Sequence, residues 1–422
     1  MRNVRQRQVI WWTAVFVLLA AAVVARNLAG LATSPPGLYL DEASIGYNAW
    51  TVAHFGVDEH GTALPLYFQA FGEYKNPVYV YALVPFARFL PLTATTVRLP
   101  AALFGLAAIA FLTLAAWRIT RSRWVAVFAL ALAALTPWLT QESRLGFEVI
   151  SMVTALAGVL WCLSGEQRST PARFAGAGVF LAVAIFAYST GRVEVLLFTG
   201  VFVAVFARRR FHRWWLTPLI VAAGLLLLGV WALQHPGALT EEFNLRSIAS
   251  DGAPLGTLMG RWAGNYISYF SPDFLFIHGD TNLRHNTGYA GMLPAIAAPL
   301  LLLGLVWCWR RRREALPKFV LLCLILGPAA AAAINNNGAP HSLRAADMLP
   351  FWLLLAVFGL DEARGLVARI APLRGALVAI FAAGLLVQGS FYLVDMYTAY
   401  PVRAAVWFDD GLPAAIAGAW HR

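Results

Sequence analysis

Residues 98–117 read RLPAALFGLAAIAFLTLAAW, an apolar run with one arginine at its start and another, Arg118, directly after it. A helix needs about 20 apolar residues to cross the hydrocarbon core of a bilayer. This run has that length, and its only charged residue is at one end. It therefore predicts a membrane-spanning helix.

Similar runs recur throughout the 422 residues. Hydrophobic residues make up 60% of the chain and charged residues 13%, whereas soluble domains are about one quarter charged. This composition excludes an ordinary soluble enzyme and a disordered chain. The sequence predicts an all-α polytopic membrane protein with about 11 transmembrane helices. The predicted spans are 9–27, 98–117, 123–139, 145–163, 173–189, 193–207, 214–233, 289–308, 317–334, 346–360 and 373–393.

Basic residues gather in every second break between these runs, beginning with Arg2, Arg5 and Arg7. The positive-inside rule places those breaks and the N-terminus in the cytoplasm, and the C-terminal tail, 394–422, outside. The net charge of +11 therefore reflects basic residues on the cytoplasmic side of a membrane protein, and no nucleic-acid partner is expected. The first run is interpreted as an uncleaved signal anchor. Together with the abundance of Arg and Ala, this predicts an integral protein of a bacterial cytoplasmic (inner) membrane.

Two segments on the predicted outer side are long, 28–97 and 234–288. Both are rich in aromatic, acidic, His and Asn residues, and long loops on a helical scaffold are where function concentrates. The predicted cytoplasmic loops are too short to form a domain or an ATP site. We therefore expect chemistry on the outer face that is not driven by ATP.

The first outer segment contains Asp41 and Glu42 immediately before a predicted amphipathic surface helix, 43–55, which Gly56 ends. The pattern leaves two roles open for Asp41, a helix N-cap or a reactive carboxylate, and the two can coexist. The later triplet 58–60, Asp-Glu-His, fits a solvated turn better than a metal site.

Lys75 precedes Asn76 and Pro77, which predict the start of a second surface helix, 78–90. An ammonium beside a helix N-terminus with free N–H groups makes a site for a phosphate. The alternative is a lysine that reaches lipid headgroups.

Four arginines stand at the outer ends of predicted spans. An arginine there is either a headgroup anchor or, if several converge on the lumen of the bundle, a ligand for a phosphorylated lipid. We predict that at least two of them are ligands. They are Arg98, Arg144, Arg192 and Arg344.

The second outer segment has a dense group of hydrogen-bonding side chains at 278–288, which suits a sugar or a phosphate. Its spacing matches no standard zinc pattern, so no metal ligands are predicted there. Candidate substrate-binding residues in or near the outer segments are Tyr81, Glu142, His285 and His341.

Taken in order, these motifs resemble the GT-C membrane glycosyltransferases, in particular the branch of protein O-mannosyltransferases and lipid A aminoarabinose transferases. The resemblance covers roughly the first 200 residues and beyond them extends to topology only. It is carried by Asp41-Glu42, the stretch 75–81 (KNPVYVY), the stretch 97–105 (VRLPAALFG), and Thr136-Pro137-Trp138 followed by Ser143-Arg144.

The resemblance implies a GT-C-type bundle over 1–393, with 28–97 as its catalytic loop, that transfers a sugar from a polyprenyl-phosphate donor to a lipid, glycan or protein acceptor. Asp41 would be the catalytic base and Glu42 its neighbour. The donor phosphate would be held by Lys75, Arg98, Arg144 and Arg344. Two departures stand out: Asn76 replaces a proline of the family, and the family's large C-terminal outer domain has no counterpart in 394–422.

The chemistry can also be argued without the resemblance. Charge builds on the lipid phosphate as the glycosidic bond breaks, so the site needs cations, and the acceptor hydroxyl needs a carboxylate to take its proton. One carboxylate suffices for a single displacement that inverts the anomeric centre. Alternatives from other classes are a flippase or transporter of lipid-linked sugars and an O-antigen ligase or polymerase, in which Asp41 would be dispensable. The sugar, the acceptor and the participation of a divalent cation stay open.

Overall fold

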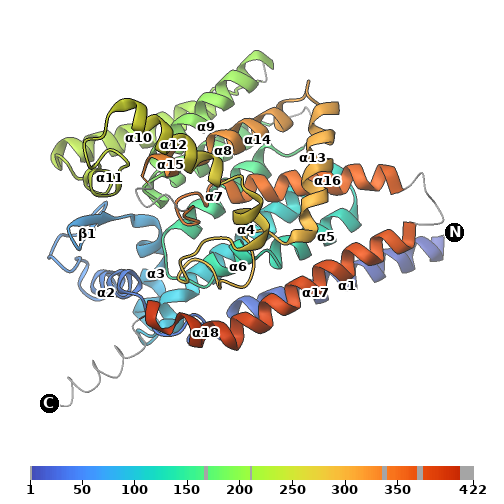
Figure 1. Ribbon diagram of the computed structural model, residues 1–422, viewed down its shortest axis with the longest axis horizontal. Helices are drawn as coiled ribbons and strands as arrows, with labels where there is room; N and C mark the ends of the chain where they lie inside the picture. Colours follow the sequence, from blue (N-terminus) through green and yellow to red (C-terminus); the bar gives the residue numbers. More distant parts are fainter. Residues whose placement is uncertain (1, 166–169, 210–211, 335–339, 368–373, 409–422) are drawn as a thin grey trace.

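The computed structural model describes residues 2–165, 170–209, 212–334, 340–367 and 374–408, and these form a bundle of helices with one short hairpin (Figure 1). The N-terminal half contains α1 (Arg2–Leu28), α2 (Leu40–Phe55), β1 (Phe68–Ala70), β2 (Glu73–Lys75), α3 (Pro77–Phe89), α4 (Ala94–Thr120), α5 (Arg123–Ala134), α6 (Pro137–Glu142), α7 (Val149–Leu163), α8 (Pro171–Ala187) and α9 (Gly191–Phe206). The C-terminal half contains α10 (Leu216–Gln234), α11 (Glu241–Arg246), α12 (Leu255–Ser268), α13 (Ala298–Arg310), α14 (Ala315–Leu326), α15 (Pro328–Ala333), α16 (Met348–Val367), α17 (Arg374–Tyr397) and α18 (Ala399–Ala404).

Every apolar run predicted from the sequence overlaps at least one helix, although 123–139 and 317–334 each contain parts of two helices and 289–308 is helical only from Ala295. Within the described residues, four helical segments are both long and apolar enough to cross a membrane: Ala94–Thr120, Leu216–Gln234, Ala315–Ala333 and Val378–Tyr397. Further apolar helices are shorter, among them α5, α7 and α8. A helical membrane protein is therefore confirmed, whereas the count of about 11 spans stays a prediction.

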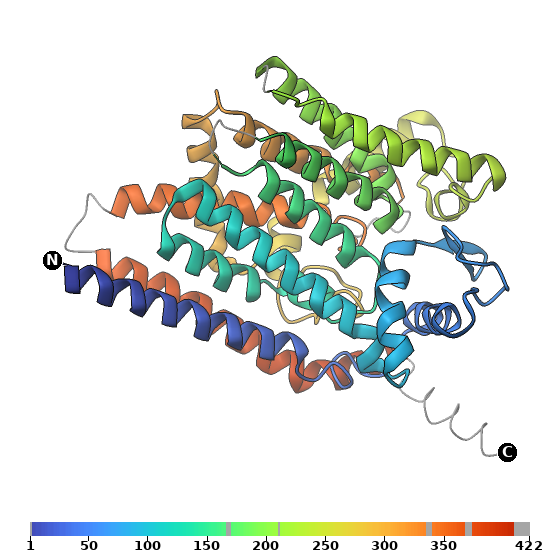
Figure 2. The ribbon, with the colours of Figure 1, turned by 180° about the vertical axis from the view of Figure 1, so that it is seen from behind.

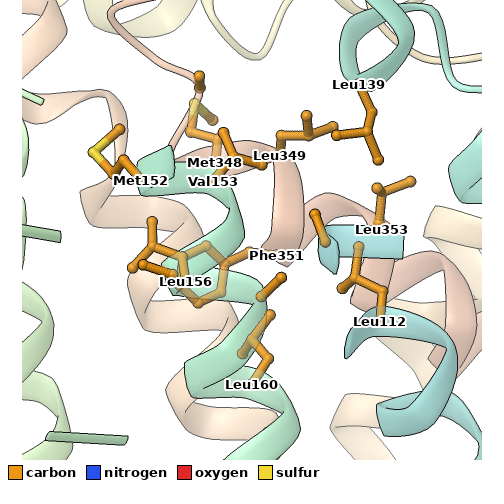
Figure 3. Close-up of a cluster of buried hydrophobic side chains, with 14 of the residues drawn as sticks. Leu112, Leu139, Met152, Val153, Leu156, Leu160, Met348, Leu349, Phe351 and Leu353 are labelled. Atoms are coloured by element: carbon orange, nitrogen blue, oxygen red, sulfur yellow. The ribbon is translucent and has the colours of Figure 1, made fainter. Parts of the chain in front are cut away.

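The centre of the bundle is an aliphatic and aromatic core between α4, α7 and α16 (Figure 3). Leu112 of α4 lies beside Leu353 of α16, and Leu156 of α7 lies beside Phe351 of α16. Leu156 and Leu160 are four residues apart and share a face of α7, whereas α16 is buried on every side from Met348 to Asp361, as expected for a helix at the centre of a bundle.

Two glycines allow α13 and α16 to cross closely. A Cβ at Gly304 would overlap the carbonyl oxygen of Leu355, and a Cβ at Gly359 would overlap that of Leu300. Small residues at such crossings let helix backbones approach each other where lipid gives no hydrophobic drive for association. The reciprocal pair fixes how these two helices pack.

The first predicted surface helix is α2, and it begins slightly earlier than the sequence pattern indicates. Its N-cap is Tyr39, whose N–H donates to Glu42 Oε2 at 3.0 Å, so the N-cap role, one of the two that the sequence leaves open for Asp41, was wrong. Asp41 lies in the first turn, where an acid is favoured by the helix dipole. Gly56 ends the helix in the left-handed conformation, as predicted (φ 71°).

A two-stranded hairpin, which the all-α prediction missed, carries Lys75. Its strands β1 and β2 pair in antiparallel register with Phe68 opposite Lys75. The connecting residues Phe71 and Gly72 both have positive φ, 54° and 76°, which matches the twist of a two-residue hairpin turn. The hairpin ends directly at Asn76, the cap of α3, and thereby fixes the place of Lys75.

The two long segments 28–97 and 234–288 lie largely at the end of the bundle away from the N-terminus (Figures 1 and 2). This is the arrangement that the charge pattern predicts, although no membrane orientation follows from it. In both views α17 runs beside α1, and the Tyr397 hydroxyl donates to the Arg26 carbonyl at 3.1 Å. Within the predicted tail, 394–422, residues 409–422 lie outside the described part of the chain.

Candidate functional site

A cavity of about 720 Å³ lies at this end of the bundle. The start of α2 and the hairpin form one wall, α9 and α10 another, and the loops before α13 and α16 a third. Its acidic, basic and histidine lining residues are Asp41, Glu73, Lys75, Glu148, Arg192, Arg246, Arg284, His285, His341 and Arg344. Polar groups that converge in a partly apolar pocket are the usual mark of a binding site.

Asp41 and Lys75 meet on the first wall. Lys75 Nζ donates to Asp41 Oδ1 at 2.7 Å and to Glu73 Oε1 at 2.5 Å. The Lys75 side chain is only 7% exposed and that of Asp41 35%. Burial disfavours the ammonium charge, but Glu148, Asp41 and Glu73 outweigh that effect and raise the pKa of Lys75 above its usual value. Asp41 therefore remains open to the cavity while an invariably charged ammonium holds it in place.

Glu148, which the sequence analysis missed, lies beside this pair. Its Oε1 accepts hydrogen bonds from the backbone N–H of Asn76 at 2.5 Å and from the Asn76 side chain at 3.3 Å. At the start of α3, where the sequence predicts a phosphate site, the N–H of the cap residue Asn76 is therefore already bound by a carboxylate of the protein. Burial raises the pKa of Glu148 to about 7, against the opposing influence of Lys75 and of the hydrogen bonds from Asn76.

Four arginines supply positive charge to the other walls: Arg246 of α11, and three that contact neighbouring groups. Arg192 Nη2 donates to Asn76 Oδ1 at 3.2 Å, the Arg284 guanidinium lies 4.3 Å from the centre of the Tyr39 ring, and Arg344 Nη1 donates to the Ile334 carbonyl at 2.5 Å. Each has further N–H groups with no hydrogen-bond partner among the described residues. Arg192 and Arg344 are two of the four arginines predicted at the outer ends of spans.

The cavity also has a long apolar side. Leucines of α9 and α10 and alanines of α15 form it, and they adjoin the charged groups. A ligand that combines a phosphate or sugar with a hydrocarbon chain suits such a lining. These residues are Leu196, Leu225, Leu228, Ala329, Ala330 and Ala333.

Two histidines predicted to bind substrate, His285 and His341, also line the cavity, and their rings stand 4.5 Å apart. His285 Nδ1 lies 3.1 Å from Asp280 Oδ2, which also accepts from the N–H and hydroxyl of Ser342 at 2.8 and 3.0 Å. Burial lowers the pKa of both histidines, so both imidazoles are neutral at pH 7.

Arg98 and Glu42 do not line the cavity. They form a fully buried ion pair, with Nε–Oε1 at 2.7 Å and Nη2–Oε2 at 2.8 Å. The remaining N–H groups of Arg98 donate to the carbonyls of Leu31, Pro35 and Gly37 at 2.6–2.9 Å. All five donors of the guanidinium are therefore engaged, and none is left for a donor phosphate.

Arg144 is likewise buried among backbone carbonyls. It donates to the oxygens of Ser34 at 2.9 Å and Ala29 at 2.7 Å and to the Tyr397 hydroxyl at 3.1 Å. It thus joins the end of α1 to α17, at a distance from the lining of the cavity. Neither Arg98 nor Arg144 is placed to act as the phosphate ligand that the resemblance implies.

Two other sequence candidates lie away from the cavity lining. The Tyr81 hydroxyl donates to the Pro65 carbonyl at 2.7 Å and ties α3 to the loop before β1. Glu142 is completely buried, neither of its carboxyl oxygens has a partner among the described residues, and burial raises its pKa well above the usual value. The triplet 58–60 forms a turn, in which Asp58 Oδ1 accepts from the N–H groups of His60 and Thr62.

Comparison with protein-family models and with curated proteins gave no match. Solved structures with the same fold do exist. The apo form of ArnT from Cupriavidus metallidurans matches with a TM-score of 0.56 at 14% identity, over 94% of this chain and 76% of ArnT. The form bound to undecaprenyl phosphate gives 0.54 at 14% identity, over 93% and 76%.

The archaeal oligosaccharyltransferase AglB from Archaeoglobus fulgidus, in complex with an inhibitory peptide and a dolichol-phosphate, matches with a TM-score of 0.52 at 14% identity. The match covers 93% of this chain and 56% of AglB, so the chain spans little more than half of that protein's length. ArnT and AglB are both GT-C glycosyltransferases. At this identity the comparisons show the fold, and they confirm the GT-C architecture that the sequence motifs predict.

Proposed function

We propose that this GT-C-fold chain transfers a sugar from a polyprenyl-phosphate donor to an acceptor on the outer face of the membrane, with Asp41 as the base. The observation that carries the proposal is the contact between Asp41 Oδ1 and Lys75 Nζ, 2.7 Å long, in the wall of a cavity lined by further cations and by leucines. ArnT, which shares the fold, has been solved with undecaprenyl phosphate, and AglB with a dolichol-phosphate.

The donor would lie with its phosphate among Lys75, Arg192, Arg284 and Arg344 and its hydrocarbon chain along the leucines of α9 and α10. These cations stabilise the charge that develops on the phosphate as the bond to the sugar breaks. Compared with the sequence-based assignment, Lys75 and Arg344 are retained, whereas Arg98 and Arg144 are replaced by Arg192 and Arg284.

Asp41 would take the proton from the acceptor. Lys75 engages Oδ1, and Oδ2 has no hydrogen-bond partner among the described residues, which leaves one carboxylate oxygen for an acceptor hydroxyl. The acceptor oxygen forms a bond to the anomeric carbon, the bond from that carbon to the phosphate oxygen breaks, and the proton passes to Asp41. One displacement of this kind inverts the anomeric centre.

The test is an assay of the purified full-length chain with polyprenyl-phosphate sugars, which reads release of polyprenyl phosphate and binding of the donor in the same samples. Asp41→Asn should bind donor but lower release by about 10²–10⁴-fold, the usual contribution of a positioned base. Glu59→Gln is the matched control, because Glu59 is an exposed carboxylate of the same long segment, 28–97, and lies outside the cavity lining. Near-normal release by Asp41→Asn would refute the role of Asp41, and absence of donor binding by the wild type would refute the activity. Retention of configuration in the product, read by NMR, would refute the single displacement.

A further inference from the structure

The loop before α13 and the loop before α16 bring Asp280, His285 and His341 together at the cavity wall. Each residue offers one ligand atom, and the three atoms lie within 4.8 Å of one another. Asp280 and His285 are five residues apart, but His341 comes from a different loop. No spacing in the sequence could have revealed this convergence.

We propose that these three residues bind a divalent metal ion of the zinc class. Two imidazole nitrogens and one carboxylate oxygen form a set that suits Zn²⁺ or Co²⁺ and leaves one coordination position open. His285 and His341 both line the cavity, so the open position faces the space where a ligand would lie.

One ring nitrogen at the site supports metal binding. His341 Nδ1 is buried and has no hydrogen-bond partner among the described residues, which is costly for a polar atom that has no ligand.

The surrounding loop also holds the ligands in position. The Ser342 N–H and hydroxyl and the Asn282 N–H, at 2.8–3.0 Å, donate to the Asp280 carboxylate, and such outer contacts orient metal ligands. Zn²⁺ binds N and O ligands at about 2.0–2.2 Å in a tetrahedron, so its ligand atoms lie about 3.3–3.6 Å apart. Movements of about one to two ångströms within the side chains would complete the site.

Two arginines face the triad, and both have protein partners of their own. Arg284 stacks over Tyr39, and Arg344 donates to the Ile334 carbonyl. Their charges reduce the attraction of the site for a cation but favour an anionic fourth ligand, such as a phosphate oxygen. The metal and the arginines would then hold the same anion.

The experiment titrates Co²⁺, and separately Zn²⁺, into the purified full-length chain after treatment with chelator. Bound Co²⁺ is read from its visible absorption, and Zn²⁺ binding by calorimetry. We expect one ion per chain in the wild type. His341→Ala and His285→Ala should weaken binding by at least about 10–100-fold, the range found even for loss of an outer contact.

His278→Ala is the matched control. His278 belongs to the same loop but is exposed and pairs with Asp273 at 2.5 Å, outside the triad. His341→Ala removes no side-chain hydrogen bond from the described residues, so it should fold even if His285→Ala does not. Absence of Co²⁺ and Zn²⁺ binding by the wild type would overturn the proposal. Equal binding by the wild type and His341→Ala would overturn it too. Neither result depends on an activity assay, so both are separate from the test of the glycosyltransferase proposal.

Discussion

Lys75 Nζ lies 2.7 Å from Asp41 Oδ1, although the two residues are 34 positions apart and belong to a hairpin and a helix. One ammonium therefore contacts the proposed base and also faces the cavity that would receive the donor. Its three N–H donors can serve Asp41, Glu73 and one further acceptor. The placement of this lysine links proton removal to binding of the leaving phosphate.

Replacement of Lys75 by methionine should chiefly weaken use of the donor. A charge-assisted hydrogen bond contributes about 1.5–3 kcal/mol, so we expect the KM for donor to rise by about 10–100-fold. The measurement is steady-state release of polyprenyl phosphate at varied donor concentration. Lys75→Arg, which keeps the charge, is the control and should lose less. An unchanged donor dependence in Lys75→Met would contradict the phosphate role.

Substitution of Arg98 should lower stability, whereas substitution of Arg344 should lower donor binding. Arg98→Ala leaves Glu42 buried without its partner, which should lower the free energy of unfolding by about 3–5 kcal/mol. Arg344→Gln removes one hydrogen bond to a carbonyl, at a cost of about 1 kcal/mol, and should mainly weaken donor binding. Denaturation in detergent and donor titration distinguish the two effects. A fully stable Arg98→Ala protein that fails to bind donor would show that Arg98 is a ligand after all.

Glu148 should make stability depend on pH near neutrality. Its pKa is about 7 in the folded chain against 4.5 for the ordinary group, so the folded state favours the protonated form. The stabilisation that it contributes is complete below about pH 4.5 and is lost as the pH rises through 7. Glu148→Gln stays neutral at every pH. The melting temperature of the variant should therefore rise relative to that of the wild type between pH 5 and pH 8. Parallel curves for the two proteins across this range would show that the shift is absent.

Two glycines of α16, one at the crossing with α13 and one away from it, test how closely these helices pack. Gly359→Ala places a methyl group against the Leu300 carbonyl and should destabilise the chain by about 1–3 kcal/mol. Gly365→Ala, in the same helix but with open space around it, should instead be neutral or stabilising by about 0.4–1 kcal/mol. Thermal unfolding of both variants measures the difference. Equal effects would mean that the close approach is not maintained in the protein.

The sequence predicts the helices well, because long apolar runs and the caps at Gly56 and Asn76 act locally. It also identifies Asp41, because an acid is favoured in the first turn of a helix, and Lys75, because an ammonium beside a helix N-terminus makes a site for an anion. The hairpin that carries Lys75 was missed because strands of three residues leave little periodicity, although Phe71-Gly72 between them gives a weak turn signal.

The roles of the arginines could not be separated from sequence. Arg98 and Arg344 both stand at the outer end of a predicted span, yet one is enclosed by three carbonyls and Glu42 while the other faces the cavity. That difference depends on how the chain folds around residues 31–37. Glu148 was missed for the same reason, because its partner Asn76 lies 72 positions away.

The charges on the cavity wall have a consequence for the end of the reaction. Five cationic residues and three carboxylates line it, a net charge of 5 − 3 = +2 with all three carboxylates ionised, histidines taken as neutral. A polyprenyl-phosphate sugar is a phosphodiester with one negative charge, whereas the polyprenyl phosphate that remains carries about −1.5 to −2 at pH 7. For the proposed reaction, the wall therefore attracts the spent carrier more strongly than the fresh donor. Turnover would then be governed by how quickly the carrier escapes along the leucines into the lipid, and added polyprenyl phosphate would inhibit the enzyme in competition with the donor.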